Sequence, residues 1–309
     1  MVGGLPSDMT TRAPQWDDLD AVYRLLAAQQ EALHGEADVT RSDVEADWGR
    51  PSFDLAADAV LVEGDTGPVG VVEVSGTAIN GGVLPGAQRQ GVGAWLLDWG
   101  IQRLRDVGVG TAGVSVPDLD DALQALVRER GFTSQYESWF FWQSLGPDSD
   151  APAGPPLRDV TVPDGMVLRN PDLDRDARAL YDVIETAFSE WPGRDPSTFE
   201  DWAAFNLEHD ELEPATSWLL EDADGTAIAA AMSMTDRGWG WLNELAVRDD
   251  RRGQGLGSLL LQQCLRSYRD LGLHTGGLAT DSRTGARDLY ERNGFAVQRS
   301  FTRWNLALD

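Results

Sequence analysis

The chain of 309 residues has no lysine, a single cysteine and only three histidines. All 25 basic residues are therefore arginines. The absence of lysine excludes both catalysis through a lysine Schiff base and a Walker A phosphate loop. Cys264 alone cannot support an internal disulfide framework, and its place in an apolar segment predicts buried packing rather than a nucleophile. His34, His209 and His274 lack the spacing of metal ligands, so we predict no metal site.

Long apolar runs are also absent. No segment approaches the ~20 apolar residues that a membrane-spanning helix needs. The N-terminal stretch MVGGLPSDMTTR has neither the charged nor the apolar region of a secretory signal, so we expect a cytoplasmic protein. A composition of 42% hydrophobic and 25% charged residues is typical of a soluble globular protein.

Positive charge is scarce, because 51 acidic residues oppose 25 basic ones and give a net charge of −26. Such a field repels nucleic acid and anionic membranes, so neither is expected as a partner. It permits a cationic small-molecule substrate, although acidic surfaces more often serve solubility. The composition leaves open whether the chain is a monomer or a homodimer.

The chain repeats itself. The segment Gln88–Val114 aligns with Arg251–Leu278, and an offset of 164 positions brings Gly91 onto Gly255. Further along, LVRERGF (126–132) matches LYERNGF (289–295) with an offset of 163. We therefore predict two copies of one domain, at residues 1–143 and 166–309. The segment 144–165 between them is rich in Pro, Gly, Asp and Ser with almost nothing to bury, which predicts a linker.

The second copy alternates strand and helix patterns. The expected strands are residues 167–169, 217–221, 226–234, 239–250, 275–280 and 301–308, with Asp222–Gly225 as a hairpin turn. Helices are expected at 172–188, where Asp172 is a candidate cap, at about 256–271 and at 285–293. This order predicts an α/β (α+β) domain with a mixed, mostly antiparallel sheet flanked by helices.

A glycine-rich stretch, RRGQGLGSLLL at Arg251–Leu261, joins a predicted strand to a predicted helix. The first amides of that helix have no partners within it, and glycines let a ligand approach the backbone, so the stretch suits a pyrophosphate. Alone, the pattern fits a tight helix–sheet corner equally well. The Rossmann fingerprint is absent because Leu260 stands where its third glycine would be.

Two motifs resemble the GNAT superfamily of acyl-CoA-dependent N-acyltransferases. Arg252–Gly257 (RGQGLG) matches the family pattern Gln/Arg-x-x-Gly-x-Gly/Ala. Ala286, Leu289 and Tyr290 match the family's later Ala-x-x-Leu-Tyr helix, followed by Gly-Phe. The resemblance covers most of residues 166–309 and, more weakly, 10–143, and the duplicated layout is similar to that of mycothiol synthases and other tandem GNAT proteins.

The resemblance implies acetyl-CoA as cosubstrate and direct attack of an amine in a ternary complex. The loop amides would hold the pyrophosphate, and the preceding strand would pair with the pantetheine arm and polarise the thioester carbonyl. The residues that it assigns to acetyl-CoA are Leu245, Ala246, Val247, Arg252, Gly253, Gln254, Gly255, Leu256, Gly257 and Ser258. The family often has Asn three residues before the alanine of the later helix, where this chain has Arg283, so that contact is made differently or lost.

Catalytic roles follow from the same resemblance. Tyr290 would donate a proton or a hydrogen bond to the departing thiolate. Glu244 is a candidate general base, whereas Asn243 could instead position a water that relays the proton. Because successive residues of a strand face opposite sides, we expect only one of these two to face the acceptor.

The first copy keeps the loop but departs elsewhere. A candidate second CoA site comprises Gln88, Arg89, Gln90, Gly91, Val92 and Gly93. Val127 stands where the second copy has Tyr290, and the strand before the loop is interrupted by glycines and a proline. We therefore expect a degenerate N-terminal domain and a catalytic C-terminal one.

The acceptor is not specified by the sequence. The segment Phe188–Pro214 follows the first helix of the second copy, a region that shapes the acceptor pocket in this family. Its acidic side chains, Glu190, Glu200 and Glu208, and the tryptophans that surround the segment, Trp191, Trp202 and Trp218, could bind a cationic amine. Such residues more often pack in a core or form a solvated face.

Three functions remain open at this stage. The first is an acetyl-CoA-dependent N-acetyltransferase that acts on a small-molecule primary amine. The second is a mycothiol synthase that acetylates a cysteinyl aminosugar. The third is a CoA-binding or CoA-sensing protein without turnover.

Overall fold

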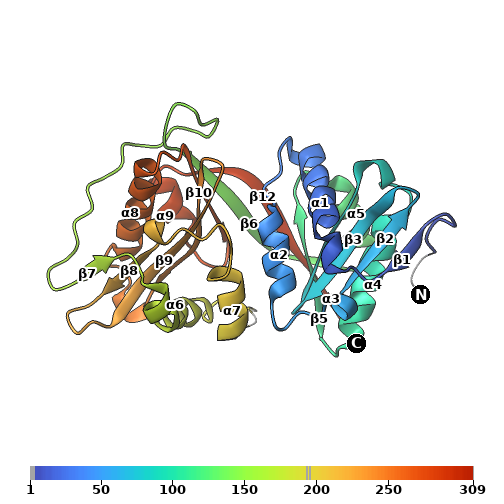
Figure 1. The fold of residues 1–309 in the computed structure, drawn as a ribbon, viewed down its shortest axis with the longest axis horizontal. Helices are drawn as coiled ribbons and strands as arrows, with labels where there is room; N and C mark the ends of the chain where they lie inside the picture. Colours follow the sequence, from blue (N-terminus) through green and yellow to red (C-terminus); the bar gives the residue numbers. More distant parts are fainter. Residues whose placement is uncertain (1–3, 193, 195, 309) are drawn as a thin grey trace. The chain divides into compact units, whose positions relative to one another are not determined.

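Two compact units make up the chain in a computed structural model, which describes residues 4–192, 194 and 196–308. Unit 1 comprises residues 1–136 and 301–309, and unit 2 comprises residues 137–300. These units differ from the predicted domains, which end at residue 143 and begin at residue 166. The C-terminal segment is grouped with unit 1, and the predicted linker is grouped with unit 2. Each unit is a mixed, mostly antiparallel sheet flanked by helices, as the sequence predicts (Figure 1).

Unit 1 is built on a sheet with the strand order β1-β2-β3-β4-β5-β12. Its strands are β1 (Thr10–Arg12), β2 (Ala59–Gly64), β3 (Gly67–Ser75), β4 (Ala78–Val83), β5 (Thr111–Pro117) and part of β12 (Ala296–Ala307). Its helices are α1 (Leu19–His34), α2 (Arg41–Gly49), α3 (Leu55–Asp58), α4 (Val92–Asp106) and α5 (Asp121–Glu129). One core packs α1 and α2 on the sheet, and a second packs α4 and α5 on its other face.

Unit 2 repeats this plan with the strand order β7-β8-β9-β10-β11-β6, read in the reverse direction. Its strands are β7 (Val167–Arg169), β8 (Trp218–Glu221), β9 (Ala227–Asp236), β10 (Trp239–Val247), β11 (Thr275–Asp281) and part of β6 (Thr133–Ser144). Its helices are α6 (Leu173–Phe188), α7 (Phe199–Asn206), α8 (Leu256–Asp270) and α9 (Arg287–Arg292). One core joins α6 and α7 to the sheet, and another joins α8 and α9 to the opposite face.

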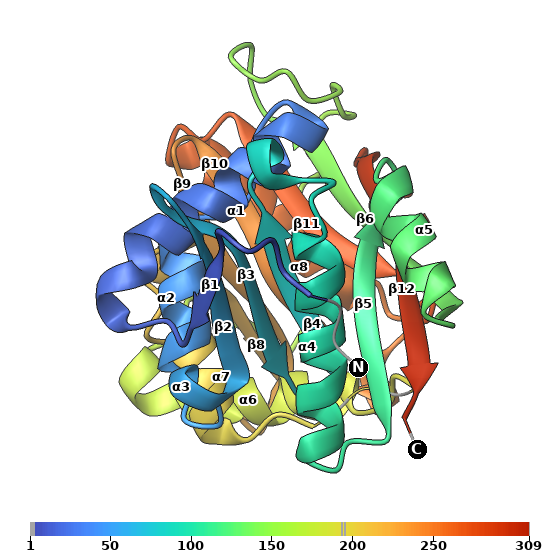
Figure 2. The ribbon, with the colours of Figure 1, turned by 90° about the vertical axis from the view of Figure 1, so that its right-hand side faces the viewer.

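The last strand of each sequence copy completes the sheet of the other unit. Residues Ser138–Ser144 of β6 pair antiparallel with β11, and Phe301–Ala307 of β12 pair antiparallel with β5, as Figure 2 shows for β5 and β12. Phe141 is fully buried in unit 2, and Trp304 lies in the core of unit 1. The prediction that residues 301–308 close the sheet of the second copy is therefore wrong.

The segment 144–165 is packed on unit 2, which also differs from the prediction that it buries almost nothing. Leu157 and Val162 lie against the core around α8. The backbone N–H of Arg158 donates to Gln262 Oε1 at 2.8 Å, and the Arg266 guanidinium donates to the Arg158 carbonyl. The segment is therefore a strap with specific contacts rather than a free linker.

Candidate functional site

Strand β10 leaves its parallel neighbour β11 part-way along its length. The two strands pair from Trp239 and Thr275 to Leu242 and Leu278, and within the described chain β10 continues from there with β9 alone. One backbone edge of Leu245–Val247 therefore faces the opening between the diverging strands. An extended ligand could add to such an edge as an extra strand does.

A bulge interrupts β10 where it diverges. Leu242 pairs with Ser233 and Glu244 with Met232, so Asn243 is an extra residue without an opposite number on β9. Such an insertion breaks the two-residue alternation of a strand. Asn243 Nδ2 donates to Asn206 Oδ1 at 2.8 Å, and Glu244 accepts from Trp202, so both side chains reach α7. The bulge therefore brings both side chains to α7, which strand alternation alone does not predict; which of them faces the acceptor stays a prediction.

Trp202 holds the carboxylate of Glu244. Its indole Nε1 lies 3.0 Å from one Glu244 oxygen and 3.2 Å from the other. Burial raises the pKa of Glu244 to about 7, while the Trp202 hydrogen bond and the nearby Arg194 charge favour the ionised form and Glu185 opposes it. Glu185 and Arg194 form a bidentate ion pair at 2.7 Å. A carboxylate with a pKa near 7 suits a general base at neutral pH.

The glycine loop follows β10 after a short 3-10 turn, Asp249–Arg251, and leads into α8. Gly253 and Gly255 have φ values of 74° and 80°, a region that glycine adopts without strain. Gly255 is the N-cap of α8 and none of the described side chains caps the helix, so the amides of its first turn have no partners within the helix. These amides, together with the helix dipole, can bind an anion such as a pyrophosphate.

Of the other predicted loop residues, Leu256 is buried in the core and can contribute only its backbone. Gln254 is exposed, and Ser258 is half-buried in the first turn of α8. The Arg252 side chain donates to the Val247 carbonyl at 3.1 Å and pairs with Glu190 at 2.6 Å.

Tyr290 lies on α9, between the aromatic rings of Phe141 and Phe295 at 5.9 and 6.3 Å. Burial raises its pKa to about 12, so its hydroxyl keeps its proton at neutral pH. Among the described residues this hydroxyl has no hydrogen-bond partner. A protonated, uncommitted hydroxyl can donate to a thiolate, whose conjugate acid has an ordinary pKa of about 8.5 for a cysteine-like thiol.

Comparison with known proteins gives this geometry a family. Residues 177–295 match the model of the Acetyltransferase (GNAT) family, and this range contains β10, the glycine loop and α9. The chain carries a GNAT acetyltransferase domain. The match lies within unit 2, where the two sequence motifs predict it.

Several proteins are similar to this chain over most of its length. A mycothiol acetyltransferase of Nocardia farcinica is 29% identical, with 94% of this chain and 95% of the relative covered. A mycothiol acetyltransferase of Pseudarthrobacter chlorophenolicus is 28% identical, with 82% and 73% covered. A crystal structure of a GCN5-related N-acetyltransferase from Sphaerobacter thermophilus has a TM-score of 0.75 at 29% identity and covers 98% of this chain and 97% of its own.

A tandem GNAT protein from the clavulanic acid biosynthesis pathway has the same fold, with a TM-score of 0.68 at 15% identity and coverage of 97% and 98%. The predicted fold of two tandem GNAT-like domains is therefore confirmed.

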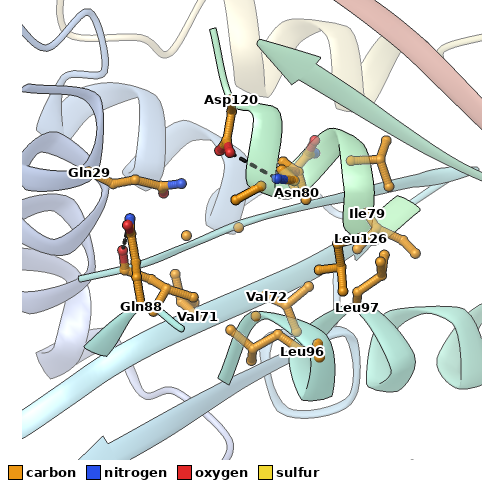
Figure 3. A pocket seen from close by; sticks show the side chains of 18 of the residues that line it. Gln29, Val71, Val72, Ile79, Asn80, Gln88, Leu96, Leu97, Asp120 and Leu126 are labelled. Atoms are coloured by element: carbon orange, nitrogen blue, oxygen red, sulfur yellow. Dashed lines mark hydrogen bonds between the residues drawn. The ribbon is translucent and has the colours of Figure 1, made fainter. Parts of the chain in front are cut away.

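Unit 1 has a cavity of about 500 Å³ at the corresponding place of its own GNAT-like fold (Figure 3). Gln88, Arg89, Gly91 and Gly93 of the predicted second CoA site line it, whereas Val92 is fully buried in the core and Gln90 is bonded to the Gly86 carbonyl. The remaining wall is mostly apolar, with Gln29, Asn80 and Asp120 as polar groups. The loop of unit 1 therefore borders a space that could hold a ligand.

Strand β4 of unit 1 forms despite its glycines, contrary to the expectation of an interrupted strand. It pairs with β3 along its length and with β5 only at Ala78 and Gly113. Val127 is fully buried among apolar side chains. Unit 1 thus keeps the diverging strands of a GNAT domain without a proton donor at the position of Tyr290.

The predicted acceptor segment is divided by the structure. Trp202 reaches Glu244, Trp191 stacks on Phe188 at 4.3 Å, and Glu190 pairs with Arg252. Trp218 instead donates to Ser267 on α8, on the opposite face of the sheet. Gly193 and Asp195 of this segment lie outside the described residues.

Arg283 pairs with Asp281 at 2.6 Å and donates to the Pro192 carbonyl at 2.8 Å, so it ties the loop after β11 to the acceptor segment.

The remaining predicted residues carry no chemistry of their own. Cys264 is fully buried, and burial raises the pKa of its thiol to about 12, as expected for packing. In the described ranges, no group of three His, Cys, Asp or Glu side chains could hold a metal ion. The described helices are likewise too short or too polar to cross a membrane.

Several residues of the site were missed in the sequence. Asn206 accepts a hydrogen bond from Asn243. The Glu185–Arg194 ion pair lies close enough to Glu244 for its charges to affect the pKa of that carboxyl. They have no motif and become visible only when α6 and α7 are packed on the sheet. The only available signal was the acidic and aromatic composition of residues 188–214.

Proposed function

We propose that unit 2 transfers an acetyl group from acetyl-CoA to a primary amine of a small molecule, by direct attack within a ternary complex. The observation that carries this proposal is the edge of β10. Strand β10 leaves β11 after Leu242 and bears Glu244. The chain then continues through the glycine loop to the N-terminus of α8. One continuous segment thus supplies a base, a backbone edge and an anion-binding helix end.

Acetyl-CoA fits the residues present. Backbone amides of the loop and of the first turn of α8, from Gly253 to Ser258, would bind the pyrophosphate. The Arg252 guanidinium, now paired with Glu190, can add a charged contact. The free edge of Leu245–Val247 would pair with the pantetheine arm, which places the thioester carbonyl beside the β10 backbone.

The proton transfers follow from the two perturbed side chains. Glu244, with a pKa of about 7, would take a proton from the incoming ammonium, directly or through a water held by Asn243. The neutral amine then attacks the thioester carbonyl, the C–S bond breaks, and Tyr290 donates its proton or a hydrogen bond to the leaving thiolate.

The acceptor can be narrowed by the relatives. Two of them that cover most of the chain are named mycothiol acetyltransferase, which favours a cysteinyl aminosugar as the acceptor to test first. A net charge of −26 also favours a cationic amine over an anionic one.

Unit 1 would bind CoA without turnover. The cavity beside Gln88–Gly93 supports binding, whereas the burial of Val127 leaves no proton donor at the position of Tyr290.

The test is release of free thiol from acetyl-CoA with a panel of amines, with cysteinyl aminosugar, amino acids and aminosugars as separate arms. We expect turnover with at least one arm and a product whose mass is increased by one acetyl group. Binding of CoA without turnover on any amine would contradict the proposal and support a CoA-sensing protein.

A further inference from the structure

A pair of buried side-chain amides joins α8 to α9 in unit 2. Gln262 is 5% exposed and Asn293 is 2% exposed. Gln262 Nε2 donates to Asn293 Oδ1 at 3.0 Å, and Gln262 Oε1 accepts from the backbone N–H of Arg158 at 2.8 Å. Leaving a buried amide unpaired is costly, so these bonds fix the orientation of both side chains.

Asn293 donates the two hydrogens of its side-chain amide to two different helices. Its Nδ2 donates to the Leu289 carbonyl in the last turn of α9 at 2.7 Å and to Ser258 Oγ in the first turn of α8 at 3.3 Å. Asn293 is also the C-cap residue of α9, the helix that carries Tyr290. One side chain therefore links the end of the tyrosine helix to the beginning of the loop helix.

The contact with Asn293 determines what Ser258 can do. A hydroxyl has one hydrogen to donate, and here its oxygen already accepts from Asn293, so the hydrogen points to another partner. Ser258 is half-buried and lies in the turn whose backbone amides have no helical partners. Its hydroxyl is thus oriented to donate to the same anion as those amides.

Unit 1 supplies an internal comparison for this pair. The offsets that align the two copies place Asp98 at the position of Gln262, and Arg130 at that of Asn293. Arg130 and Asp98 form an ion pair at 2.7 Å between α5 and α4. Ala94 stands at the position of Ser258. Both units therefore join the two helices, but only unit 2 has a hydroxyl on which the link can act.

We infer that Asn293 is a positioning residue that orients the Ser258 hydroxyl toward the pyrophosphate of CoA. This inference rests on the proposed function of unit 2. A role limited to stability would need only a helix-to-helix link, which the ion pair of unit 1 provides without a hydroxyl.

The test is a double-mutant cycle of Asn293→Ala and Ser258→Ala, read as the KM for acetyl-CoA and as kcat. We expect each single substitution to raise KM by about tenfold or more with kcat within a factor of two, as for loss of one hydrogen bond to a charged group. In the Ser258→Ala background, Asn293→Ala should raise KM less than twofold. An equal increase in both backgrounds would overturn the inference.

Two further arms separate the possible failures. If Asn293→Ala does not fold, Asn293→Asp replaces it, because Asp keeps the shape of the side chain and the acceptor for Gln262 but lacks the two donor hydrogens. The negative charge of Asp is present with Ser258 and with Ser258→Ala alike, so the same double-mutant cycle applies. Arg130→Ala in unit 1 should lower the melting temperature without changing KM. If the wild type shows no turnover, the proposed function fails, and the same cycle in Kd for CoA still tests Asn293.

Discussion

Units 1 and 2 have the same fold and a similar glycine loop, yet they differ at the two positions where the proposed mechanism requires side-chain chemistry. Tyr290 of unit 2 corresponds to Val127 of unit 1, and Glu244 corresponds to Asn80. The loop acts through backbone amides and glycine dihedrals, which most side-chain changes leave intact. General acid and base catalysis require particular ionisable groups. Ligand binding is therefore easier to retain after duplication than turnover.

One side-chain pair recurs in a changed position. In unit 2, Trp202 of α7 donates to Glu244 on β10, and in unit 1, Trp48 of α2 donates to Glu73 on β3 at 2.7 Å. Burial raises the pKa of Glu73 to about 7, as it does for Glu244. Glu73 pairs across the strands with Asn80 and is not among the residues that line the cavity. These twins provide matched controls for the predictions that follow.

The largest effect is expected from Glu244→Gln. Removal of the base should lower kcat/KM by about 100-fold to 1,000-fold, because the incoming ammonium can no longer pass its proton to the enzyme. Steady-state thiol release with the preferred amine measures this loss. The matched change Glu73→Gln should leave kcat/KM unchanged, and equal losses from both substitutions would remove the distinction between the units.

Tyr290→Phe should lower kcat by about tenfold to 100-fold. The effect is smaller because a thiolate is a stable leaving group that gains only part of its stabilisation from the donated proton. Val127→Ala in unit 1 is the control and should affect thermal stability alone, since Val127 is fully buried in the core. Unchanged kcat in Tyr290→Phe would exclude Tyr290 as the acid.

Trp202→Phe tests the hydrogen bond to Glu244. This bond favours the ionised carboxylate, so its loss should raise the pKa of Glu244 above about 7. Because the base must be ionised, wild-type kcat/KM should rise with pH and reach half of its maximum near pH 7. In the variant this midpoint should shift to a higher pH by roughly 0.5–1 unit. A midpoint at the wild-type pH would contradict the assignment, and Trp48→Phe should not move it.

The smallest effect concerns stability. Burial raises the pKa of Glu73 to about 7, so the folded chain keeps this proton at pH values where the unfolded chain has lost it. The free energy of unfolding should therefore fall as the pH rises from about 4.5 to 7. Glu73→Gln removes this term, so between pH 5 and pH 8 the wild type should lose about 2 kcal/mol relative to the variant. Urea unfolding at both pH values measures the difference, and parallel changes in the two proteins would show that Glu73 is not buried as described.

The sequence predicted what local patterns and internal repetition determine. Strands β7 to β11, helices α6, α8 and α9, the glycines at positions 253 and 255, and the duplication all follow from residue spacing, whereas helix α7 was not predicted. The pairing of β12 with β5 did not, because residues 301–307 lie about 190 positions from their partners and nothing local specifies the match. The bulge at Asn243 also escaped, since it depends on which β9 residues lie opposite.

The central claim is that turnover belongs to unit 2 and that unit 1 only binds CoA. A carboxylate in the first turn of α8 or of α4, the helices that follow the two glycine loops, tests this directly. A Cβ at Gly257 would meet Leu289 at 3.7 Å and one at Gly93 would meet Val83 at 3.8 Å, which are ordinary contacts, so a side chain is tolerated at both positions. A glutamate there would repel the pyrophosphate.

Calorimetric titration with CoA and thiol release should be measured together on Gly257→Glu and Gly93→Glu. We predict two CoA sites in the wild type and one in each variant, with turnover abolished by Gly257→Glu and retained in Gly93→Glu. Loss of turnover in Gly93→Glu, or full turnover in Gly257→Glu, would contradict the account.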